Sequence, residues 1–358
     1  MAESPRPFTL EIDDAAIRAL HDRLALTRLP DQAPGQPWET GTDLAFMARL
    51  VEHWRKRFDW RTHEARLNAF PQYKVRLAGI DLHYLHVPGV PAPGGPEPIP
   101  LLLSHGWPGS VFEFLDIIGP LTDPASHGGN PADAFTVIAP SLPGYGLSFA
   151  PGQPRFDTTQ IADCFHQLMT EVLGYRRFGA QGGDWGSFIT SGLAHRHPAS
   201  CIGIHLNMMP IKRSTTLEGE TTAEERRYLA ELAHFLKEET GYQWIQGTRP
   251  QTLAYGLNDS PAGLAAWIVE KLRAWSDCGG DPETVFTMDQ MLANISLYWF
   301  TGCIGASFWP YYARMAGPGR SLTANRSGYR PATASFRPRS CARHARCSAR
   351  MPTSGAGR

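Results

Sequence analysis

Short apolar runs alternate with helical patterns in the middle of the chain, and this alternation constrains the fold more than any other feature. Runs of strand length and composition lie at 101–103, 135–139, 175–180 and 202–206, with helical stretches at 112–118 and 158–173 between them. Strands that alternate with helices in this way form parallel sheets with crossover helices. The sequence therefore predicts an α/β fold.

An aspartate stands at the turn that follows the third of these strands. The segment Gly182-Gly-Asp184-Trp-Gly186 has the spacing of a nucleophile elbow, a sharp strand-to-helix turn whose small residues expose the central side chain. Gly-Gly-Asp also occurs in ordinary turns, so the flanking elements decide. A strand before Asp184 and a helix predicted over residues 187–195 favour a nucleophile. Ser187 lies a turn beyond the elbow position, which disfavours a serine hydrolase.

Other patterns precede and follow this region. Helical spacing occurs at 12–26 and 44–54, an irregular aromatic connector at 59–73 and a hairpin at 73–87. After residue 210 the alternation stops, and the chain becomes helical and aromatic, with Ser260-Pro261 typical of a helix start. A helical block at this place predicts a lid inserted over the carboxyl edge of the sheet.

Charge is distributed unevenly along the chain. Residues 317–358 contain nine Arg and no Lys, Asp or Glu, so residues 1–316 carry 25 basic against 34 acidic side chains, a net charge of −9. An acidic body argues against nucleic acid or an anionic membrane as the main partner. The start of the sequence has no apolar leader pattern and no apolar run of membrane-spanning length follows, which favours a cytoplasmic protein.

The six cysteines form no C-x-x-C pair, which predicts reduced, mostly packed thiols in a chain of 358 residues. Cys341, His344 and Cys347 lie close together near the end of the chain, but no second ligand cluster accompanies them. A metal site is therefore not expected.

Two further loops belong to the same predicted sheet edge. His105-Gly-Trp107-Pro-Gly-Ser110 leaves one strand in a Gly-containing turn that can direct backbone N–H groups at a developing negative charge, and 141–148 leaves the next strand. Together with Gly182–Ser187, these segments resemble the epoxide hydrolases of the α/β-hydrolase superfamily, particularly their microsomal-type branch. The resemblance runs from about residue 6 to 316 and includes further segments at 59–61, 70–73, 241–242, 247–250, 257–264 and 297–299.

The resemblance implies a role for each matching residue. Asp184 would attack an epoxide carbon and form a covalent alkyl-enzyme ester. Tyr242 and Tyr311 would hydrogen-bond the epoxide oxygen and supply its proton. The backbone N–H groups of Trp107 and Trp185 would form the oxyanion hole when water attacks the ester. The expected substrate is a small or aromatic epoxide, the product is a vicinal diol, and no cofactor is required.

The resemblance also implies a division of the chain and its partners. It is expected to comprise an epoxide hydrolase-type N-terminal region (1–98), an α/β-hydrolase core (99–210), a helical lid (211–300), a return towards the core (301–316) and an atypical Arg-rich tail (317–358). The expected partners are the epoxide and water, and the sequence is also compatible with a homodimer. His105 is interpreted as a hydrogen-bonded buried histidine, and orientation of the loop is the alternative role.

The sequence departs from the family after Met315. The family continues with two core strands that carry an acid and then a histidine, which activate the hydrolytic water; here an Arg-, Ser- and Pro-rich stretch follows, whose one histidine is His344. The abrupt change suggests a frameshift near residue 316, with a genuine basic tail as the alternative. We expect residues 317–358 to be disordered or poorly packed. Because the acid and the histidine are not found, we expect the enzyme to be inactive or limited to a single turnover.

Two other functions remain open at this stage. A haloalkane dehalogenase also uses an elbow aspartate, and the indole N–H groups of Trp107 and Trp185 could bind its halide. A non-catalytic ligand-binding homologue would keep the lidded pocket without forming a covalent adduct. Tyr242, Tyr311 and the long N-terminal region favour the epoxide.

Overall fold

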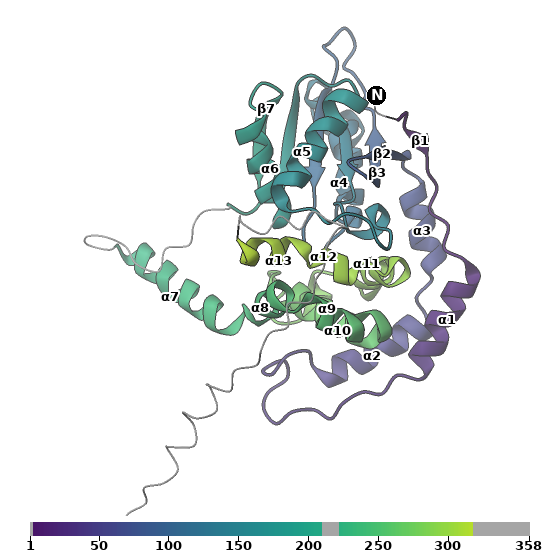
Figure 1. Ribbon diagram of the computed structural model, residues 1–358, viewed down its shortest axis with the longest axis vertical. Coiled ribbons are helices and arrows are strands. Elements are labelled where there is room, and N and C mark those ends of the chain that lie inside the picture. The colour runs from purple at the N-terminus through teal and green to yellow at the C-terminus, as the bar shows by residue number, and fades with distance from the viewer. Residues whose placement is uncertain (1–2, 210–221, 318–358) are drawn as a thin grey trace, which may run out of the picture. The chain divides into compact units, whose positions relative to one another are not determined.

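A single mixed sheet forms the centre of the molecule. The computed structural model describes residues 3–209 and 222–317. Within them seven strands pair in the order β1-β2-β3-β5-β4-β6-β7 (Figure 1). Their bounds are β1 Arg6–Pro7, β2 Gln72–Leu77, β3 Ile80–Val87, β4 Ile99–Ser104, β5 Phe135–Pro140, β6 Phe178–Gly182 and β7 Cys201–Leu206.

The sheet has a parallel and an antiparallel half. Strands β5, β4, β6 and β7 run parallel, which confirms the fold expected from the alternation of strands and helices. Strand β3 pairs antiparallel with β5, and β2 and β1 extend the same antiparallel half. The hairpin predicted over residues 73–87 is thus part of the central sheet. Because β4 and β6 are parallel neighbours, the loops after Ser104 and Gly182 leave the sheet at one edge.

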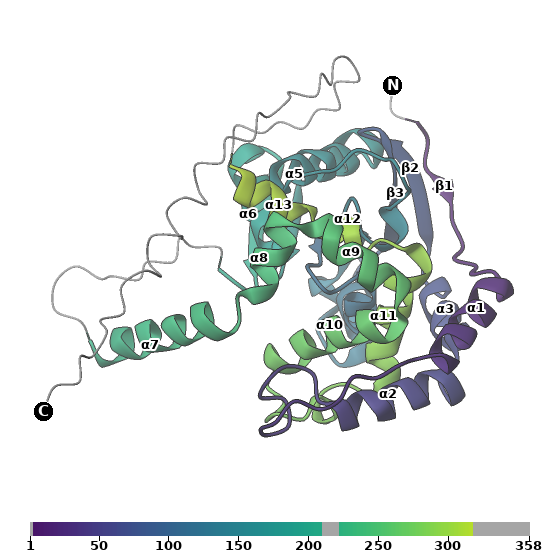
Figure 2. The ribbon, with the colours of Figure 1, turned by 60° about the horizontal axis from the view of Figure 1, so that its bottom comes forward.

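Helices cover the sheet and form a second layer beyond its carboxyl edge. Helices α4, α5 and α6 accompany the strands, whereas α8–α13 lie across the strand ends, and α1 and α2 pack against α10 and α11 (Figures 1 and 2). The bounds are α1 Asp14–Ala25, α2 Leu44–Lys56, α3 Trp60–Asn68, α4 Leu115–Thr122, α5 Thr158–Gln167, α6 Trp185–Arg196, α7 Ala223–Glu238, α8 Gly241–Thr248, α9 Pro250–Asp259, α10 Pro261–Ala274, α11 Met288–Thr301, α12 Ile304–Ser307 and α13 Trp309–Ala316.

One stretch predicted to be irregular is helical. Helix α3 occupies the aromatic connector, and Asp59 caps it by accepting a hydrogen bond from the Arg61 amide. Trp60, Glu64 and Leu67 share one buried face, and the Trp60 indole donates to Glu64. The prediction of an irregular connector was therefore wrong: the i, i+4, i+7 spacing was present, but a charged residue at the buried position 64 concealed it.

The third parallel strand starts later than predicted. The expected strand at 175–180 is shifted, because β6 begins at Phe178 and the Tyr175 amide still bonds to Met169 O in the preceding turn. Gly174 adopts φ +75°, which lets the chain turn sharply after the π-helical segment Leu168–Val172 that follows α5. The shift brings the end of the strand to Gly182, next to Asp184.

Several local expectations are met. Ser260 Oγ accepts a bond from the Gly263 amide and Pro261 opens α10, as the helix-start pattern predicted. The four cysteines within the described residues are free and buried. Cys341, His344 and Cys347 and the Arg-rich tail lie outside the described residues.

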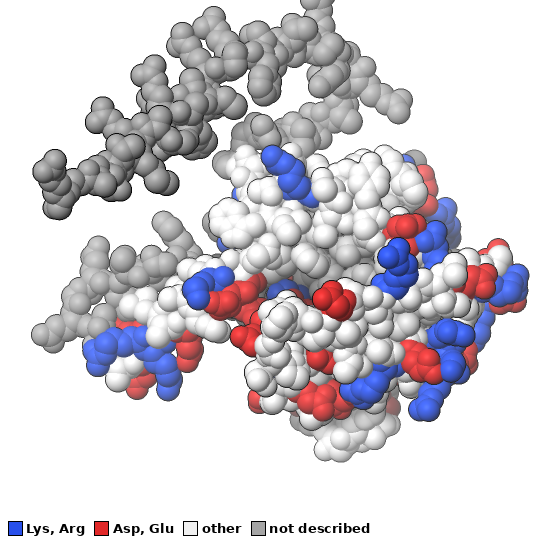
Figure 3. Space-filling model, turned by 90° about the horizontal axis from the view of Figure 1, so that it is seen from below, with Lys and Arg blue, Asp and Glu red and all other residues white. Residues whose placement is uncertain are grey.

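Acidic and basic side chains are interspersed on the face seen in Figure 3. None of the helices among the described residues has the length and apolar character needed to traverse a bilayer.

Candidate active site

Asp184 occupies the sharp turn between β6 and α6. Its backbone has φ 48° and ψ −122°, in a region that side-chain-bearing residues rarely adopt. A Cβ on Gly182 would collide with the Gly186 carbonyl, and a Cβ on Gly186 would collide with Ser104 O, so both glycines are required by close packing. The Ser187 hydroxyl donates to Gly182 O at 2.8 Å and ties the turn together. The chain therefore has the elbow geometry that the glycine spacing predicted.

Two backbone N–H groups converge on the Asp184 carboxylate. The Trp107 amide donates to Oδ1 at 2.8 Å, and the Trp185 amide also bonds to the carboxylate. A side chain at position 106 would collide with Asp184, so the glycine lets the loop approach closely. The two amides assigned to the oxyanion hole from sequence are therefore brought together at one carboxylate.

The surroundings of Asp184 set its protonation state. Burial raises the pKa of its carboxyl to about 6, because the charged form loses solvation, and the hydrogen bonds from Trp107 and Trp185 oppose that rise. At neutral pH the group is still mainly ionised. It is thus a desolvated carboxylate, as a nucleophile requires.

Tyr242 on α8 and Tyr311 on α13 meet above the elbow. Their rings lie edge to face with centroids 5.6 Å apart, and both side chains are buried. The Tyr242 ring stacks on Trp107 at 5.5 Å, and the Tyr311 ring lies 4.7 Å from Trp185. The adjacent Tyr312 is half-buried and its ring packs on Trp309 instead.

The Tyr311 hydroxyl is suited to remain protonated. Burial raises the pKa of Tyr311 well above its ordinary value, and the negative charge of Asp184 adds to the rise, with a weaker opposing interaction from the Trp185 side chain. By hydrogen-bond geometry the hydroxyl has no partner among the described residues. It can therefore donate its proton to an oxygen placed in the site.

His105 supports a loop. Its Nδ1 lies 3.0 Å from Gly106 O, and its Nε2 accepts a hydrogen bond from the Leu142 amide at 3.1 Å. The ring therefore joins the loops that follow β4 and β5. Burial lowers the pKa of His105 to about 4, which keeps the ring neutral. The interpretation as a buried, hydrogen-bonded histidine is confirmed.

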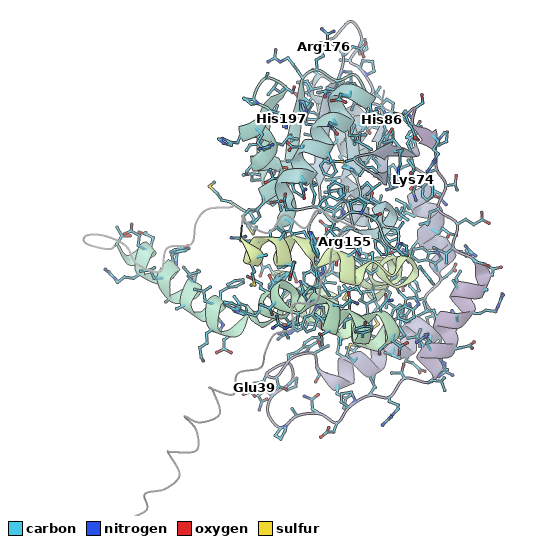
Figure 4. The ribbon with its side chains drawn as sticks, viewed as in Figure 1. Glu39, Lys74, His86, Arg155, Arg176 and His197 are labelled. Carbon is cyan, nitrogen blue, oxygen red and sulfur yellow. The ribbon has the colours of Figure 1, made fainter. Side chains whose placement is uncertain are left out.

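A group of two histidines and one aspartate lies away from Asp184, on α5 and just after α6. His197 and His166 stack at 3.8 Å, and His197 contacts Asp163 at 2.8 Å. Figure 4 shows His197 beside the sheet layer, away from the lid helices. Among the described ranges, no cluster of three metal-ligating side chains occurs.

Two titratable residues near Asp184 were not predicted from the sequence. Tyr145 is fully buried, and burial followed by the Asp184 charge raises its pKa well above the ordinary value. Desolvation and then the Asp184 charge raise the pKa of Glu113, and the exposure of this residue limits the rise. Ser110-x-x-Glu113 has the spacing of a helix-capping box, a signal that could have placed Glu113 against this loop.

Comparison with known protein families gives two matches. Residues 5–114 match a family described as the epoxide hydrolase N terminus, and residues 99–238 match the alpha/beta hydrolase fold. The central sheet and the elbow are those of that fold.

Individual relatives agree with these matches. The chain is 46% identical over 304 residues to an epoxide hydrolase homologue of Stigmatella aurantiaca, covering 84% of this chain and 67% of the relative. It is 38% identical to epoxide hydrolase 1 of Oryctolagus cuniculus, with 88% and 74% covered. The crystal structure of juvenile hormone epoxide hydrolase from the silkworm Bombyx mori superposes with a TM-score of 0.73 at 33% identity, covering 87% of this chain and 77% of the other.

Proposed function

The chain belongs to the epoxide hydrolase family, and on that basis we propose that Asp184 opens the epoxide by nucleophilic attack. The observation that carries this proposal is that the Trp107 and Trp185 amides converge on the Asp184 carboxylate, with the Trp107 amide on Oδ1, so we assign the attack to Oδ2. As the Oδ2–carbon bond forms, the carbon–oxygen bond of the ring breaks and its electron pair moves to the epoxide oxygen.

The departing oxygen takes a proton from a lid tyrosine. Tyr311 is the stronger candidate, because its buried hydroxyl has no competing partner among the described residues. Tyr242 is the second donor, and the ring packing of the two tyrosines supports joint binding of the epoxide oxygen. Proton donation is required because an alkoxide is a poor leaving group even from a strained ring.

The ester is then hydrolysed when water attacks its carbonyl carbon and the bond between that carbon and Oδ2 breaks to release the diol. One proton of the water goes to the leaving alkoxide and the other restores the lid tyrosine. The carbonyl oxygen becomes an oxyanion at Oδ1, where the Trp107 and Trp185 amides stabilise it. Both ring nitrogens of His105 are already engaged with the loops, so His105 is not the base for this water. We therefore propose that alkylation is faster than hydrolysis and that the ester accumulates.

Aromatic side chains favour an apolar or aryl-substituted epoxide. Trp107 and Trp185 flank the tyrosines, and Trp275 and Phe308 pack against Trp107. Such surroundings bind flat apolar groups through ring contacts and burial. The product would be the corresponding vicinal diol, formed in the cytoplasm, with water as the second reactant.

Intact-mass measurement after mixing with styrene oxide tests the proposal. A species heavier by one epoxide should appear and persist, with diol formed slowly. The Asp184→Asn variant is the control and should show no added mass. Absence of both adduct and diol would contradict the proposed reaction, and rapid diol formation over many turnovers would contradict slow hydrolysis.

Dehalogenation is a second candidate reaction, because two indole N–H groups beside Asp184 could bind a halide. The indole N–H groups of Trp107 and Trp185 are buried and have no hydrogen-bond partner among the described residues. Halide release from a bromoalkane, compared with diol formation from the epoxide under the same conditions, separates the two reactions. A non-catalytic binding protein would yield neither the adduct nor halide.

A further inference from the structure

Lid helix α11 contacts the loop that carries the Trp107 amide. Asn294 Nδ2 donates to Pro108 O at 2.7 Å, and its Oδ1 accepts from the Ser110 hydroxyl at 2.8 Å. One turn later the Tyr298 hydroxyl donates to Gly109 O at 2.8 Å. Three consecutive loop residues after Trp107 are thereby held by one helix.

The opposite face of α11 is anchored to the N-terminal helices. The Trp54 indole of α2 donates to Ser296 Oγ at 3.1 Å, and the Phe300 ring lies 5.0 Å from Trp60 of α3. Two helical residues correspond to about 200° of rotation, so positions 296 and 300 point away from positions 294 and 298. The face of α11 that carries Ser296 and Phe300 is therefore anchored to α2 and α3, while the opposite face holds the loop.

We propose that Asn294 and Tyr298 are positioning residues that keep the Trp107 amide directed at Asp184 Oδ1. The inference rests on the proposed function of Asp184. The Pro108 carbonyl shares a peptide unit with the Gly109 N–H, which donates to Gly106 O at 3.0 Å, and Gly106 O lies in the same peptide unit as the Trp107 N–H. Fixing the Pro108 and Gly109 carbonyls therefore restrains the Trp107 N–H through this turn. Tyr298 is only 1% exposed, so water does not readily replace its hydroxyl at Gly109 O.

The Asn294 and Tyr298 side chains position the Trp107 amide and do not contact the substrate. Neither is assigned a contact with the epoxide, and both act through loop carbonyls. A small displacement of an oxyanion-hole donor reduces the rate of the chemical step more than it reduces binding. Their effect should therefore be on the maximal rate of alkylation.

The test compares Tyr298→Phe with the wild-type full-length chain by quenched-flow intact mass on styrene oxide. The maximal alkylation rate should fall about tenfold, with the half-saturating epoxide concentration unchanged within about twofold. The acid limb of the pH–rate profile, where alkylation slows as Asp184 is protonated, should also move to higher pH. The Trp107 hydrogen bond lowers the pKa of Asp184, so weakening that bond raises the pKa. Ser296→Ala, on the opposite face, is the matched control and should keep the wild-type alkylation rate within about twofold.

The outcomes separate this inference from the proposed function. If the wild-type chain forms neither adduct nor diol, the proposed function fails. If it reacts and Tyr298→Phe reacts at the same rate, or reacts more slowly without a shift of the acid limb, the positioning role is contradicted. Should Tyr298→Phe fail to fold, Asn294→Leu removes the donor to Pro108 O with similar size and no added charge, and it decides by the same criteria.

Discussion

The amide nitrogen of Trp107 lies 2.8 Å from Oδ1 of Asp184, so the donor expected to stabilise an oxyanion already holds the resting nucleophile. This hydrogen bond orients the carboxylate by its Oδ1 atom. The same donor can stabilise that oxygen again when water attacks the ester. A single loop position thus serves both half-reactions of the proposed function.

Alkylation should depend on pH through Asp184. The pKa of its carboxyl is raised to about 6, so the nucleophile is protonated below that pH and the rate should rise as pH passes through 6. The pKa of Tyr311 is raised well above 10, so the proton donor is retained and no decline is expected up to pH 9. Adduct formation measured from pH 4 to 9 should give one ascending limb; a descending limb below pH 9 would argue against Tyr311 as the acid.

Asp184→Asn should stabilise the folded chain in a pH-dependent way. An acid whose pKa is raised on folding, here from 3.8 to about 6, destabilises the folded state as pH rises between those values. The variant should match the wild type at pH 3.5 and gain up to ~3 kcal/mol in unfolding free energy at pH 7.5. Urea denaturation at both pH values measures this, and a variant that is less stable at pH 7.5 would show that burial of the charge is not costly.

Removal of the Tyr311 hydroxyl should slow alkylation. Tyr311→Phe keeps the ring packing against Trp185 and loses the proton donor, so a fall of roughly 100-fold is expected. Tyr312→Phe is the matched control, because the Tyr312 ring packs on Trp309, and it should react at the wild-type rate. Equal rates for both variants, measured by adduct mass over time, would remove Tyr311 from the mechanism.

Two glycines of α6 should differ sharply in their tolerance of alanine. A Cβ on Gly186 would collide with the backbone of Ser104, so Gly186→Ala should lose several kcal/mol, on the order of 3, or fail to fold. The nearest atom to a Cβ on Gly192 is Ala162 Cβ at 3.7 Å, so Gly192→Ala should be tolerated and gain up to ~1 kcal/mol from helix propensity. Thermal melts of the pair test the packing account of the elbow, and equal stability would contradict it.

The elbow could be predicted because its signals are local. Gly182, Asp184 and Gly186 lie within one turn of the chain, and a strand and a helix flank them. The role of the Trp107 amide was implied by the resemblance to the epoxide hydrolases, and in the structure its loop leaves β4, the parallel neighbour of β6.

Long-range packing left weaker signals in the sequence. Tyr298 and Asn294 bind backbone carbonyls, and any loop residue supplies a carbonyl, so nothing in the sequence identifies their partners. Helix α3 was missed for a related reason, because the charge of the buried Glu64 is compensated by a partner, Arg61, whose contact appears only in the fold.

The central claim is that Asp184 is the residue that becomes alkylated. Peptide mass spectrometry after brief exposure to styrene oxide and an acid quench tests it most directly. The account predicts that the added mass lies on Asp184 within the peptide that spans the elbow, and that Asp184→Asn abolishes it. An adduct on another residue, or one that survives in Asp184→Asn, would contradict the account.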